Sequence, residues 1–309
     1  MILEKTDLDM QLNDENLVVA VYMITYNHEK FIEQAIRSVV DQKAYFKYKL
    51  FLGDDFSTDK TREICLKLKE KYPEKIHLVL NEKNIGATMN AQNIYKLCFN
   101  SGARYIAMLE GDDYWTDKRK LQKQVDFMDK NPNYSICFNN SQQVDKENKI
   151  IDKCIITENK EKTFSIEDLA LQNFMHTASV LFRKNFTKLP DWIVHSPAGD
   201  YPLHMLNARF GLIKYLPETM SVYRLGDGIW SSLSRVNQLI STLMTVQLII
   251  NEFKDDAKVK SLLAVHYNSL LVALENFITE KNRVEINKEK IASTLRIRDL
   301  LKIIWRKMM

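Results

Sequence analysis

Cysteines are few in this sequence, and their spacing gives them no shared role. The 309 residues include four of them, and no two form a C-x-x-C pair. This scatter gives no sign of a disulfide framework. Two of the four stand in apolar runs, so we expect reduced thiols in the core of a cytosolic protein. The cysteines are Cys65, Cys98, Cys137 and Cys154.

Long apolar runs and a strong net charge are also missing. No stretch approaches the roughly 18–20 consecutive apolar residues of a membrane-spanning helix. The N-terminal segment MILEKTDLDM carries acids in place of the apolar core of a signal peptide. The net charge is only +4, without the basic face typical of nucleic-acid binders. We therefore expect a cytoplasmic protein that contacts no nucleic acid and lies, at most, peripherally at the inner face of a membrane.

Apolar and amphipathic segments alternate from residue 17 to residue 130. Continuous apolar runs bounded by polar residues are typical of parallel strands buried on both faces. Each run is followed by a stretch with helical spacing, and this rhythm predicts an α/β fold with a Rossmann-like, mostly parallel central sheet. The expected strands are 17–24, 48–52, 76–80 and 105–109, and the expected helices are 29–42, 59–71, 86–100 and 118–130.

The pattern changes from Tyr134 onward. We expect added antiparallel strands and loops over the crevice of the sheet, with a polar excursion at 139–163. Beyond about Ser234, apolar residues at helical spacing predict a helical C-terminal extension. The expected strands of this half are 134–138, 178–183, 212–216 and 220–224, and its expected helices are 165–171 and 200–210.

The segment 290–309 holds six Lys or Arg residues against one acid, with apolar residues interleaved. This pattern predicts a basic amphipathic helix. Such a helix can lie on an anionic membrane surface, or it can dock on its own domain with the basic face in water. The sequence leaves both alternatives open. Apolar C-terminal helices also make a homodimer a reasonable expectation.

The strand expected at 105–109 leads into two adjacent acids, Asp112 and Asp113. An α/β sheet opens its ligand crevice at the carboxyl ends of its strands. Two neighbouring carboxylates repel each other, and Mg²⁺ is a suitable partner because it prefers one or two carboxylates together with phosphate oxygens. A solvated turn is the alternative, but such a turn does not need the aromatic residues Tyr114 and Trp115 that follow.

A polar cluster, Thr25-Tyr-Asn-His-Glu29, follows the first expected strand. Tyr26 offers a flat face to a nucleobase, and Thr25 and Asn27 offer hydrogen bonds. The same residues can serve the next helix, with Asn27 as its N-cap and Glu29 in its first turn. Both roles are compatible.

Two further clusters follow the second and third expected strands. After the second strand, Ser57 or Thr58 can cap the next helix, whereas Asp55 has no such role and can accept from a nucleobase N–H or a ribose hydroxyl. After the third strand, Asn84-Ile-Gly86 opens a helix, where backbone N–H groups favour an anion or a donor oxygen. Both clusters belong at the crevice of the predicted sheet.

Together these motifs resemble those of the family 2 glycosyltransferases, which have the GT-A fold. The resemblance spans about residues 17–232 and leaves the C-terminal helices uncovered. The matching pieces are Tyr26-Asn27, Asp54-Asp55-x-Ser57-Thr58-Asp59, Asn84-x-Gly86, Gly111-Asp112-Asp113, Gly199-Asp200-Tyr-Pro-Leu203 and Val222-Tyr223-Arg224.

The resemblance implies a division of the chain. An N-terminal extension (1–16) precedes a GT-A domain (17–234), and a helical C-terminal region (235–309) follows it. Within the GT-A domain we expect a nucleotide-sugar-binding half (17–133) and an acceptor-binding half (134–234).

The resemblance also implies a reaction. It is the inverting, metal-dependent transfer of a sugar from a nucleotide-diphosphate sugar, most commonly a UDP-sugar, to a glycan or lipid-linked acceptor in surface polysaccharide biosynthesis. Asp113 and Asp112 would hold Mn²⁺ or Mg²⁺, a Lewis acid for the departing diphosphate. Asp200, which opens a later helix, would act as general base. The residues implied for nucleotide binding are Thr25, Tyr26, Asn27, Glu29, Asp55, Asn84, Gly86, Asn90 and Asp112.

Acceptor contacts are expected from His176, Trp115 and Trp230, although an aromatic residue near a strand end more often packs in the core. His204 stands one helical turn after Asp200, where a core or rim position is the better expectation. Relatives of this type commonly carry a His after Tyr-Arg and before the Trp. The segment from Arg224 to Trp230 has none, which leaves that role to Asp227 or to no residue.

Three alternatives compete with this hypothesis. The first is a catalytically weak or inactive nucleotide-sugar-binding protein in a glycan assembly complex, which the intact acids argue against. A sugar-phosphate nucleotidyltransferase would need a Gly-rich phosphate loop where this sequence has Thr25–Glu29. A phosphatase of the Asp-x-Asp-x-Thr type is excluded, because that spacing follows none of the expected strands.

Overall fold

The computed structural model describes residues 13–151, 156, 159–226, 228 and 230–286. Cys154, Asp227 and the expected basic helix 290–309 lie outside these residues. Contacts divide the chain into two compact units, one ending at Ser232 and one beginning at Leu233. The donor and acceptor halves expected within the first unit remain a prediction.

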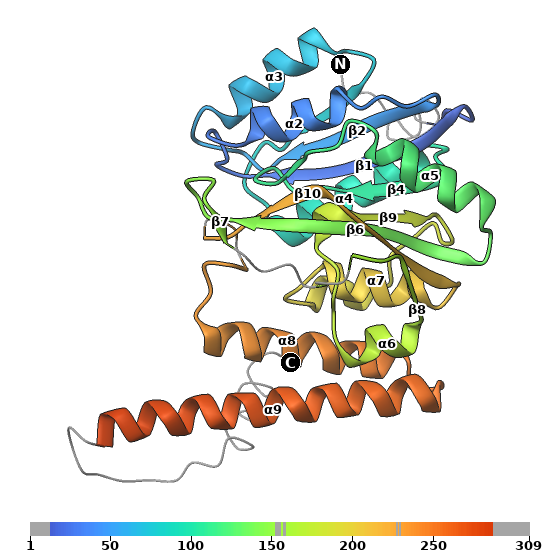
Figure 1. The fold of residues 1–309 in the computed structure, drawn as a ribbon. Helices are drawn as coiled ribbons and strands as arrows, with labels where there is room; N and C mark the ends of the chain where they lie inside the picture. Colours follow the sequence, from blue (N-terminus) through green and yellow to red (C-terminus); the bar gives the residue numbers. More distant parts are fainter. Residues whose placement is uncertain (1–12, 152–155, 157–158, 227, 229, 287–309) are drawn as a thin grey trace. The chain divides into compact units, whose positions relative to one another are not determined.

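One ten-stranded sheet organises the described part of the first unit, and it is the mostly parallel α/β sheet that the sequence predicts (Figure 1). The strand order is β3-β2-β1-β4-β9-β6-β10-β5, with β7 paired to β6 and β8 paired to β10. β1 to β4 run parallel, so their carboxyl ends share one edge. The strands are β1 (Leu17–Thr25), β2 (Lys47–Asp54), β3 (Ile76–Leu80), β4 (Tyr105–Met108), β5 (Tyr114–Trp115), β6 (Tyr134–Val144), β7 (Ile150–Ile151), β8 (Lys162–Phe164), β9 (Val180–Arg183) and β10 (Leu212–Arg224).

Helices cover both faces of the parallel strands. Val19, Val21 and Met23 of β1 pack in one core cluster with residues of α2, α3 and α5. On the other face, Tyr22 stacks on Tyr95 of α4, with ring centroids 4.1 Å apart. Successive strand side chains point to opposite faces, so β1 is buried on both, as its unbroken apolar run predicts. The helices of this unit are α2 (Ile32–Val40), α3 (Thr61–Lys71), α4 (Ala87–Asn100), α5 (Lys120–Lys130), α6 (Ile166–Leu171) and α7 (Asp200–Ala208), with 3-10 turns η1 (Thr177–Ser179) and η2 (Asp191–His195).

The second half of the sheet differs from the expectation in two ways. The strands expected at 212–216 and 220–224 are one strand, β10, whose register with β6 shifts between Leu216 and Ser221. β6 and β10 pair in parallel, not antiparallel, and β9 runs antiparallel between β4 and β6. β6 also continues to Val144 because polar side chains of the expected excursion bond across to β10, as Ser141 Oγ does to Ser221 Oγ at 2.6 Å.

The second unit consists, as far as the structure describes it, of α8 (Arg235–Glu252) and α9 (Ala257–Ile286). Of the described helices, α9 alone is long and apolar enough, over Ala257–Thr279 and at mean hydropathy 1.2, to cross a membrane by length and composition. No unbroken apolar run marks this segment in the sequence, because His266 and Glu275 interrupt it. The two helices pack through a small cluster formed by Leu239, Leu243 and Leu274.

A lysine lies inside the core of the first unit. Lys120, at the start of α5, has no exposed surface. Its ammonium group donates to Gln124 Oε1 at 2.8 Å and lies 4.3 Å from the centroid of the Trp115 ring. Burial lowers the pKa of Lys120 to about 7. The hydrogen bond and the ring therefore replace only part of the hydration that the charged form loses.

Lys120→Met should remove a specific pH dependence of stability. The pKa of this group is about 7 in the fold and about 10.4 in the unfolded chain, so the unfolded state binds more protons between those values. The free energy of unfolding should therefore increase by about 1.4 kcal/mol for each pH unit as the pH rises through this window. Below pH 7 the gain in stability from deprotonating Lys120 is lost. Urea denaturation of wild type, K120M and the exposed control K130M over that range measures the slopes. Equal slopes for all three would contradict the burial of a charge.

Candidate functional site

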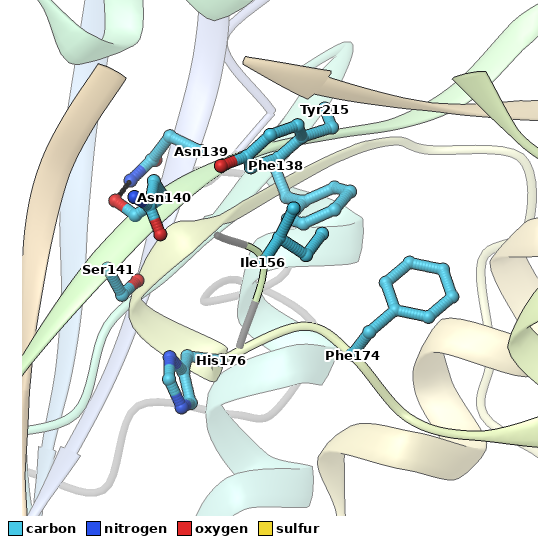
Figure 2. A pocket seen from close by; sticks show the side chains of 8 residues that line it. All are labelled: Phe138, Asn139, Asn140, Ser141, Ile156, Phe174, His176 and Tyr215. Carbon is cyan, nitrogen blue, oxygen red and sulfur yellow. Dashed lines mark hydrogen bonds between the residues drawn. The ribbon is translucent and has the colours of Figure 1, made fainter. Parts of the chain in front are cut away.

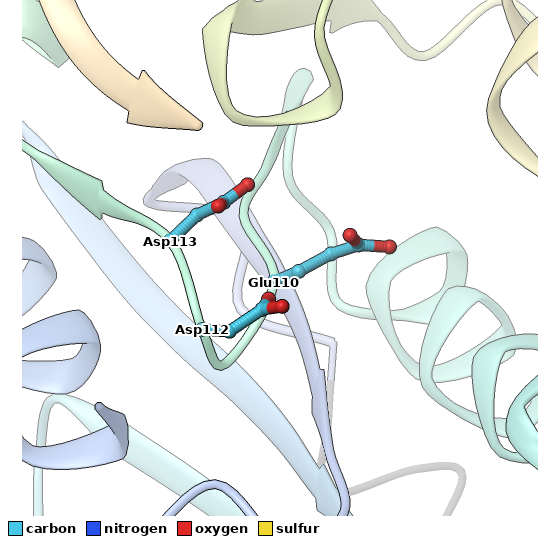
Figure 3. Close-up of side chains that lie close together, drawn as sticks. All are labelled: Glu110, Asp112 and Asp113. Atoms are coloured by element: carbon cyan, nitrogen blue, oxygen red, sulfur yellow. The ribbon is translucent and has the colours of Figure 1, made fainter. Parts of the chain in front are cut away.

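The carboxyl end of β4 carries a cluster of three carboxylates (Figure 3). Glu110, Asp112 and Asp113 follow the strand in one turn, and their ligand oxygens all lie within 4.8 Å of one another. The two aspartates are 5% and 1% exposed. The structure thus places both predicted acids at the crevice edge and adds Glu110, which the sequence reasoning did not assign. Its position one glycine before Asp112 was the available signal.

Burial and the neighbouring acids raise the pKa values of two members of this cluster, Asp113 and Glu110. Burial, followed by Asp112 and Glu110, raises the pKa of Asp113 well above its ordinary value, while Arg224 lowers it. Burial, followed by Asp112 and Asp200, raises the pKa of Glu110 to about 8. Oxygen ligands gathered in this way suit a hard divalent cation.

Asp113 has one carboxylate oxygen committed and one open. Oδ1 accepts the backbone N–H of Arg224 at 2.8 Å. Oδ2 is buried and has no hydrogen-bond partner among the described residues. A buried oxygen without a partner is costly, and a cation would satisfy it. The donor set and the open oxygen therefore fit the predicted metal.

The acid turn requires a glycine at its centre. The N–H of Gly111 donates to the carbonyl of Ile24 in β1 at 3.0 Å. A Cβ at this position would lie 2.6 Å from Thr25 Oγ1 and 2.9 Å from His28 Nδ1. Thr25, predicted to bind the nucleotide, is 2% exposed and packs against this turn. Its contact with a nucleotide remains a prediction.

Asn27 joins the loop after β1 to the loop after β2. Its N–H donates to Ser57 Oγ at 3.0 Å, and its Oδ1 accepts the N–H of Thr58 at 2.8 Å. Its φ of 55° is in the left-handed region, which asparagine tolerates better than most residues. The expected caps are wrong, because Phe31 occupies the N-cap of α2 and Lys60 that of α3.

Glu29 makes a second connection between these loops. Its N–H donates to Asp59 Oδ2 at 3.0 Å, and its Oε2 accepts the N–H of Lys60 at 3.1 Å. Asp59 Oδ1 in turn accepts the N–H of Thr61 at 2.9 Å, which fixes the start of α3. The groups of Glu29 that were expected to meet a nucleotide are used to shape the rim of the crevice.

Asp55 is buried, and its carboxylate already accepts three hydrogen bonds. Oδ1 accepts from Asn81 Nδ2 and from the N–H of Ile85, both at 2.9 Å. Oδ2 accepts from the N–H of Gly86 at 2.9 Å. Asp55 therefore has a structural role that the sequence did not indicate, because it fastens the loop between β3 and α4. The anion expected at the start of α4 is this carboxylate.

The predicted nucleotide contacts in and after that loop are also structural. Asn90 is 1% exposed, and its Nδ2 donates to the carbonyl of Gly53 at 3.0 Å. The nucleotide contact of Asn90 remains a prediction, and in the structure its amide donates to the backbone of β2. Asn84 Oδ1 accepts the N–H of Gly86 at 3.1 Å, and the φ of 85° at Gly86 is a conformation that favours glycine. Asn84 and Gly86 thus set the shape of the loop.

The aromatic residues predicted at the site divide into exposed and buried ones. Tyr26 is 43% exposed at the end of β1, so one ring face is open to a base. Trp115 is 4% exposed, and its indole N–H donates to the carbonyl of Ala178 at 2.8 Å. The acceptor role of Trp115 remains a prediction, and in the structure the core and Lys120 cover its ring. Trp230 is partly buried, and its acceptor role remains a prediction.

Asp200 opens α7 with an oriented carboxylate. Its Oδ1 accepts the N–H of Tyr201 at 2.7 Å, and its Oδ2 accepts from Asn173 Nδ2 at 3.4 Å. Its charge raises the pKa of Glu110. The fold therefore brings Asp200 within electrostatic reach of the acid cluster, although a long stretch of chain separates the two.

Two histidines lie within the influence of Asp200, one partly buried and one fully buried. Burial lowers the pKa of His176 to about 4, and Asp200 opposes that shift. Its Nε2 lies 3.1 Å from Gln143 Nε2, and its ring stacks on Tyr223 at 4.6 Å. Burial also lowers the pKa of His204, which has no exposed surface. The core position expected for His204 is confirmed.

A small pocket lies beside His176, with polar side chains on one side and apolar ones on the other (Figure 2). Its volume of about 10 Å³ is close to the minimum for one water molecule, so a hydroxyl group fits and a sugar ring does not. A wider groove of about 600 Å³ lies elsewhere, between α2 and the segment 114–118. The small pocket is lined by Phe138, Asn139, Asn140, Ser141, Ile156, Phe174, His176 and Tyr215.

Residues 20–189 match the family described as Glycosyl transferase family 2, and the chain belongs to that family, as its motifs predict. The uncharacterized protein Rv1520 of Mycobacterium tuberculosis is 34% identical over 219 residues, which are 69% of this chain and 61% of that protein. The putative teichuronic acid biosynthesis glycosyltransferase TuaG of Bacillus subtilis is 41% identical over 111 residues, which are 36% of this chain and 42% of that protein. The chain thus spans less than two thirds of the length of these relatives.

Solved structures agree on the fold. TarS 1–349 of S. aureus, in complex with UDP-GlcNAc, superposes with a TM-score of 0.57 at 19% identity and covers 81% of this chain and 73% of its own. The mannosyltransferase PcManGT of Pyrobaculum calidifontis, in complex with GDP-Man and Mn²⁺, gives a TM-score of 0.54 at 14% identity, with 89% and 82% covered. The predicted fold class is confirmed.

Gly111→Ala should destabilise the protein, whereas Gly199→Ala should not. The added Cβ at Gly111 meets Thr25 and His28 below 3.0 Å, while no described atom lies within 4 Å of a Cβ at Gly199. Overpacking of this kind costs roughly 1–3 kcal/mol. Thermal and urea denaturation of both variants measure the difference. Equal stabilities would show that the turn can move away from β1 without cost.

Proposed function

We propose that this chain is an inverting glycosyltransferase that moves a sugar from a nucleotide-diphosphate sugar to an acceptor hydroxyl. One observation carries the proposal: a buried acid cluster at the carboxyl edge of the sheet lies within electrostatic reach of Asp200, a carboxylate from a distant helix. The acid cluster suits a diphosphate held through a cation. Asp200 suits a general base that removes a proton.

The donor end of the site is formed by the loops after β1, β2 and β3. Tyr26 offers its exposed ring to the base, and Asp55 lies buried beside it, at the end of β2. UDP is the first choice of nucleotide, because the TarS structure holds UDP-GlcNAc. GDP is the second, because PcManGT holds GDP-Man.

The acid cluster is the site for Mn²⁺ or Mg²⁺. Asp113 through Oδ2, Asp112 and Glu110 would hold the ion, and Asp112 would also face the ribose. A divalent cation bound there supplies a Lewis acid for the departing diphosphate. The residues of the chain contribute by keeping the carboxylates together in a dry turn, where their charge acts at full strength.

Asp200 removes the proton of the acceptor hydroxyl as that oxygen attacks the anomeric carbon. The carbon–oxygen bond to the diphosphate breaks as the new bond forms on the opposite face, so the configuration inverts. The N–H of Tyr201 and the amide of Asn173 fix the carboxylate for this step. His176 and Trp230 are the candidate acceptor contacts of the same half.

The acceptor we propose is a glycan or a lipid-linked glycan of a surface polysaccharide. TuaG, the relative named for teichuronic acid biosynthesis, supports this class. A cytoplasmic location, a peripheral membrane contact through the basic segment 290–309 and a homodimer belong to the same proposal.

Asp113→Ala should abolish metal-dependent stabilisation by the nucleotide. A thermal-shift panel of UDP, TDP and GDP, with and without Mn²⁺, should show one base that stabilises the wild type strongly. A ligand at 100 times its Kd adds about 2.7 kcal/mol. The exposed variant Asp126→Ala should keep the full shift. Equal shifts in D113A and wild type would show that the metal does not bind at this site.

Asp200→Asn should lower kcat for sugar transfer by roughly 10²–10⁴-fold and leave the thermal shift with UDP and Mn²⁺ unchanged. The amide keeps the shape of the side chain and cannot take the proton. Asp191→Asn, whose side chain is 90% exposed, is the matched control. Transfer at the wild-type rate by D200N would refute the base assignment. Donor binding by the wild type without turnover on any acceptor would favour a nucleotide-sugar-binding protein.

A further inference from the structure

We infer that Arg224 is a positioning residue that ties the β6–β7 hairpin to the acid turn, so that Asn148 on the hairpin helps set the affinity for the divalent cation. The inference rests on the proposed metal site. Asn148 is not among the donor and acceptor contacts named above. The coupling runs through one buried guanidinium group.

One end of Arg224 holds the acid turn. Its backbone N–H donates to Asp113 Oδ1 at 2.8 Å, which leaves Oδ2 as the open ligand atom. Its Nε donates to the carbonyl of Asp112 at 2.9 Å. The position of the Asp112 main chain decides where its carboxylate lies. Arg224 therefore fixes both aspartates without being a ligand.

The other end of Arg224 binds the hairpin. Its Nη1 donates to the carbonyl of Asp145 at 3.2 Å and to Asn148 Oδ1 at 2.9 Å. Asp145 Oδ1 accepts the N–H groups of Glu147 and Lys149, at 3.0 and 2.8 Å, so the turn has a defined shape. Asn148 has a φ of 64°, which places its side chain where the guanidinium can reach it.

The guanidinium transmits position because it is rigid and dry. Arg224 is 1% exposed, and its planar fork carries both sets of bonds in one plane. The ring of Phe31 lies 4.2 Å below the guanidinium carbon and that of Tyr114 5.9 Å away. Nη2 has no partner within the described chain, so the loss of a further bond leaves a buried charge still less satisfied. A shift at the hairpin therefore reaches the carbonyl of Asp112.

The strand pairing explains why Arg224 is the residue that connects the hairpin to the acid turn. β6 and β10 pair in parallel with Arg224 beside Val144, the last residue of β6 before the hairpin turn. β10 also pairs antiparallel with β5, which directly follows the acid turn. The end of β10 is thus the point at which the hairpin and the acids are both neighbours.

Asn148→Gly is the decisive variant, because glycine adopts the same positive φ and the substitution removes the side chain whose Oδ1 accepts from Arg224. Mn²⁺ alone is titrated into the full chain, and free Mn²⁺ is followed by electron paramagnetic resonance. N148G and Arg224→Lys should weaken Mn²⁺ binding by roughly 10- to 100-fold, the usual effect of losing a residue that orients a metal ligand. Asn148→Asp, which keeps an acceptor oxygen, should bind close to wild type. Lys146→Ala, on the same turn with a side chain 62% exposed, is the control and should change nothing.

Three outcomes would overturn the inference, and the first two are wild-type Mn²⁺ affinity in a folded N148G and no Mn²⁺ binding by the wild type itself. If R224K fails to fold, N148G still decides, because its backbone is unchanged. A matching loss of affinity in N148G and K146A would show a general effect of hairpin stability and would also refute the role of Asn148. Mn²⁺ binding that follows the expected order, in a protein that transfers no sugar, would uphold this inference and refute the proposed function.

Discussion

Repulsion among the carboxylates of Glu110, Asp112 and Asp113 is the constraint on which the rest of the site depends. Folding gathers them in one largely buried turn, where Asp112 raises the pKa of both Glu110 and Asp113 and Glu110 also raises that of Asp113. The turn can hold them because its backbone is fixed from two sides, by β1 at Gly111 and by β10 at Arg224. The fold thus stores an electrostatic cost that a cation at the proposed metal site would relieve, which favours a hard, positively charged ligand there.

The rim of the crevice is built from the side chains of neighbouring loops. Asn27 and Glu29 bond the loop after β2, and Asp55 bonds the loop after β3. Residues whose types suggest ligand contacts are therefore occupied in holding one loop to the next. This gives the crevice a fixed shape before any ligand arrives, which lowers the entropy lost on binding.

The parallel half of the fold could be predicted because its strands are continuous apolar runs, as in β1 and β4, and such runs report burial on both faces. The second half was harder. β6 carries polar residues such as Ser141 that look like loop until their partner on β10 is known, and the direction of that pairing leaves no mark in either segment. The acid pair could be located from its place after a strand. The roles of Glu110 and Arg224 could not, because they arise from contacts between segments far apart in the chain.

The three hydrogen bonds on Asp55 have a consequence for base selectivity. A carboxylate has about four acceptor positions, and Asn81, Ile85 and Gly86 fill three of them. One lone pair remains to accept a hydrogen bond from the edge of a base. Uracil and thymine present a single imide N–H there, whereas guanine presents an imide N–H and an amino group side by side and would need both oxygens. In the proposed donor site, fastening its own loop would make this aspartate a monodentate acceptor, which a pyrimidine would satisfy without displacing any backbone amide.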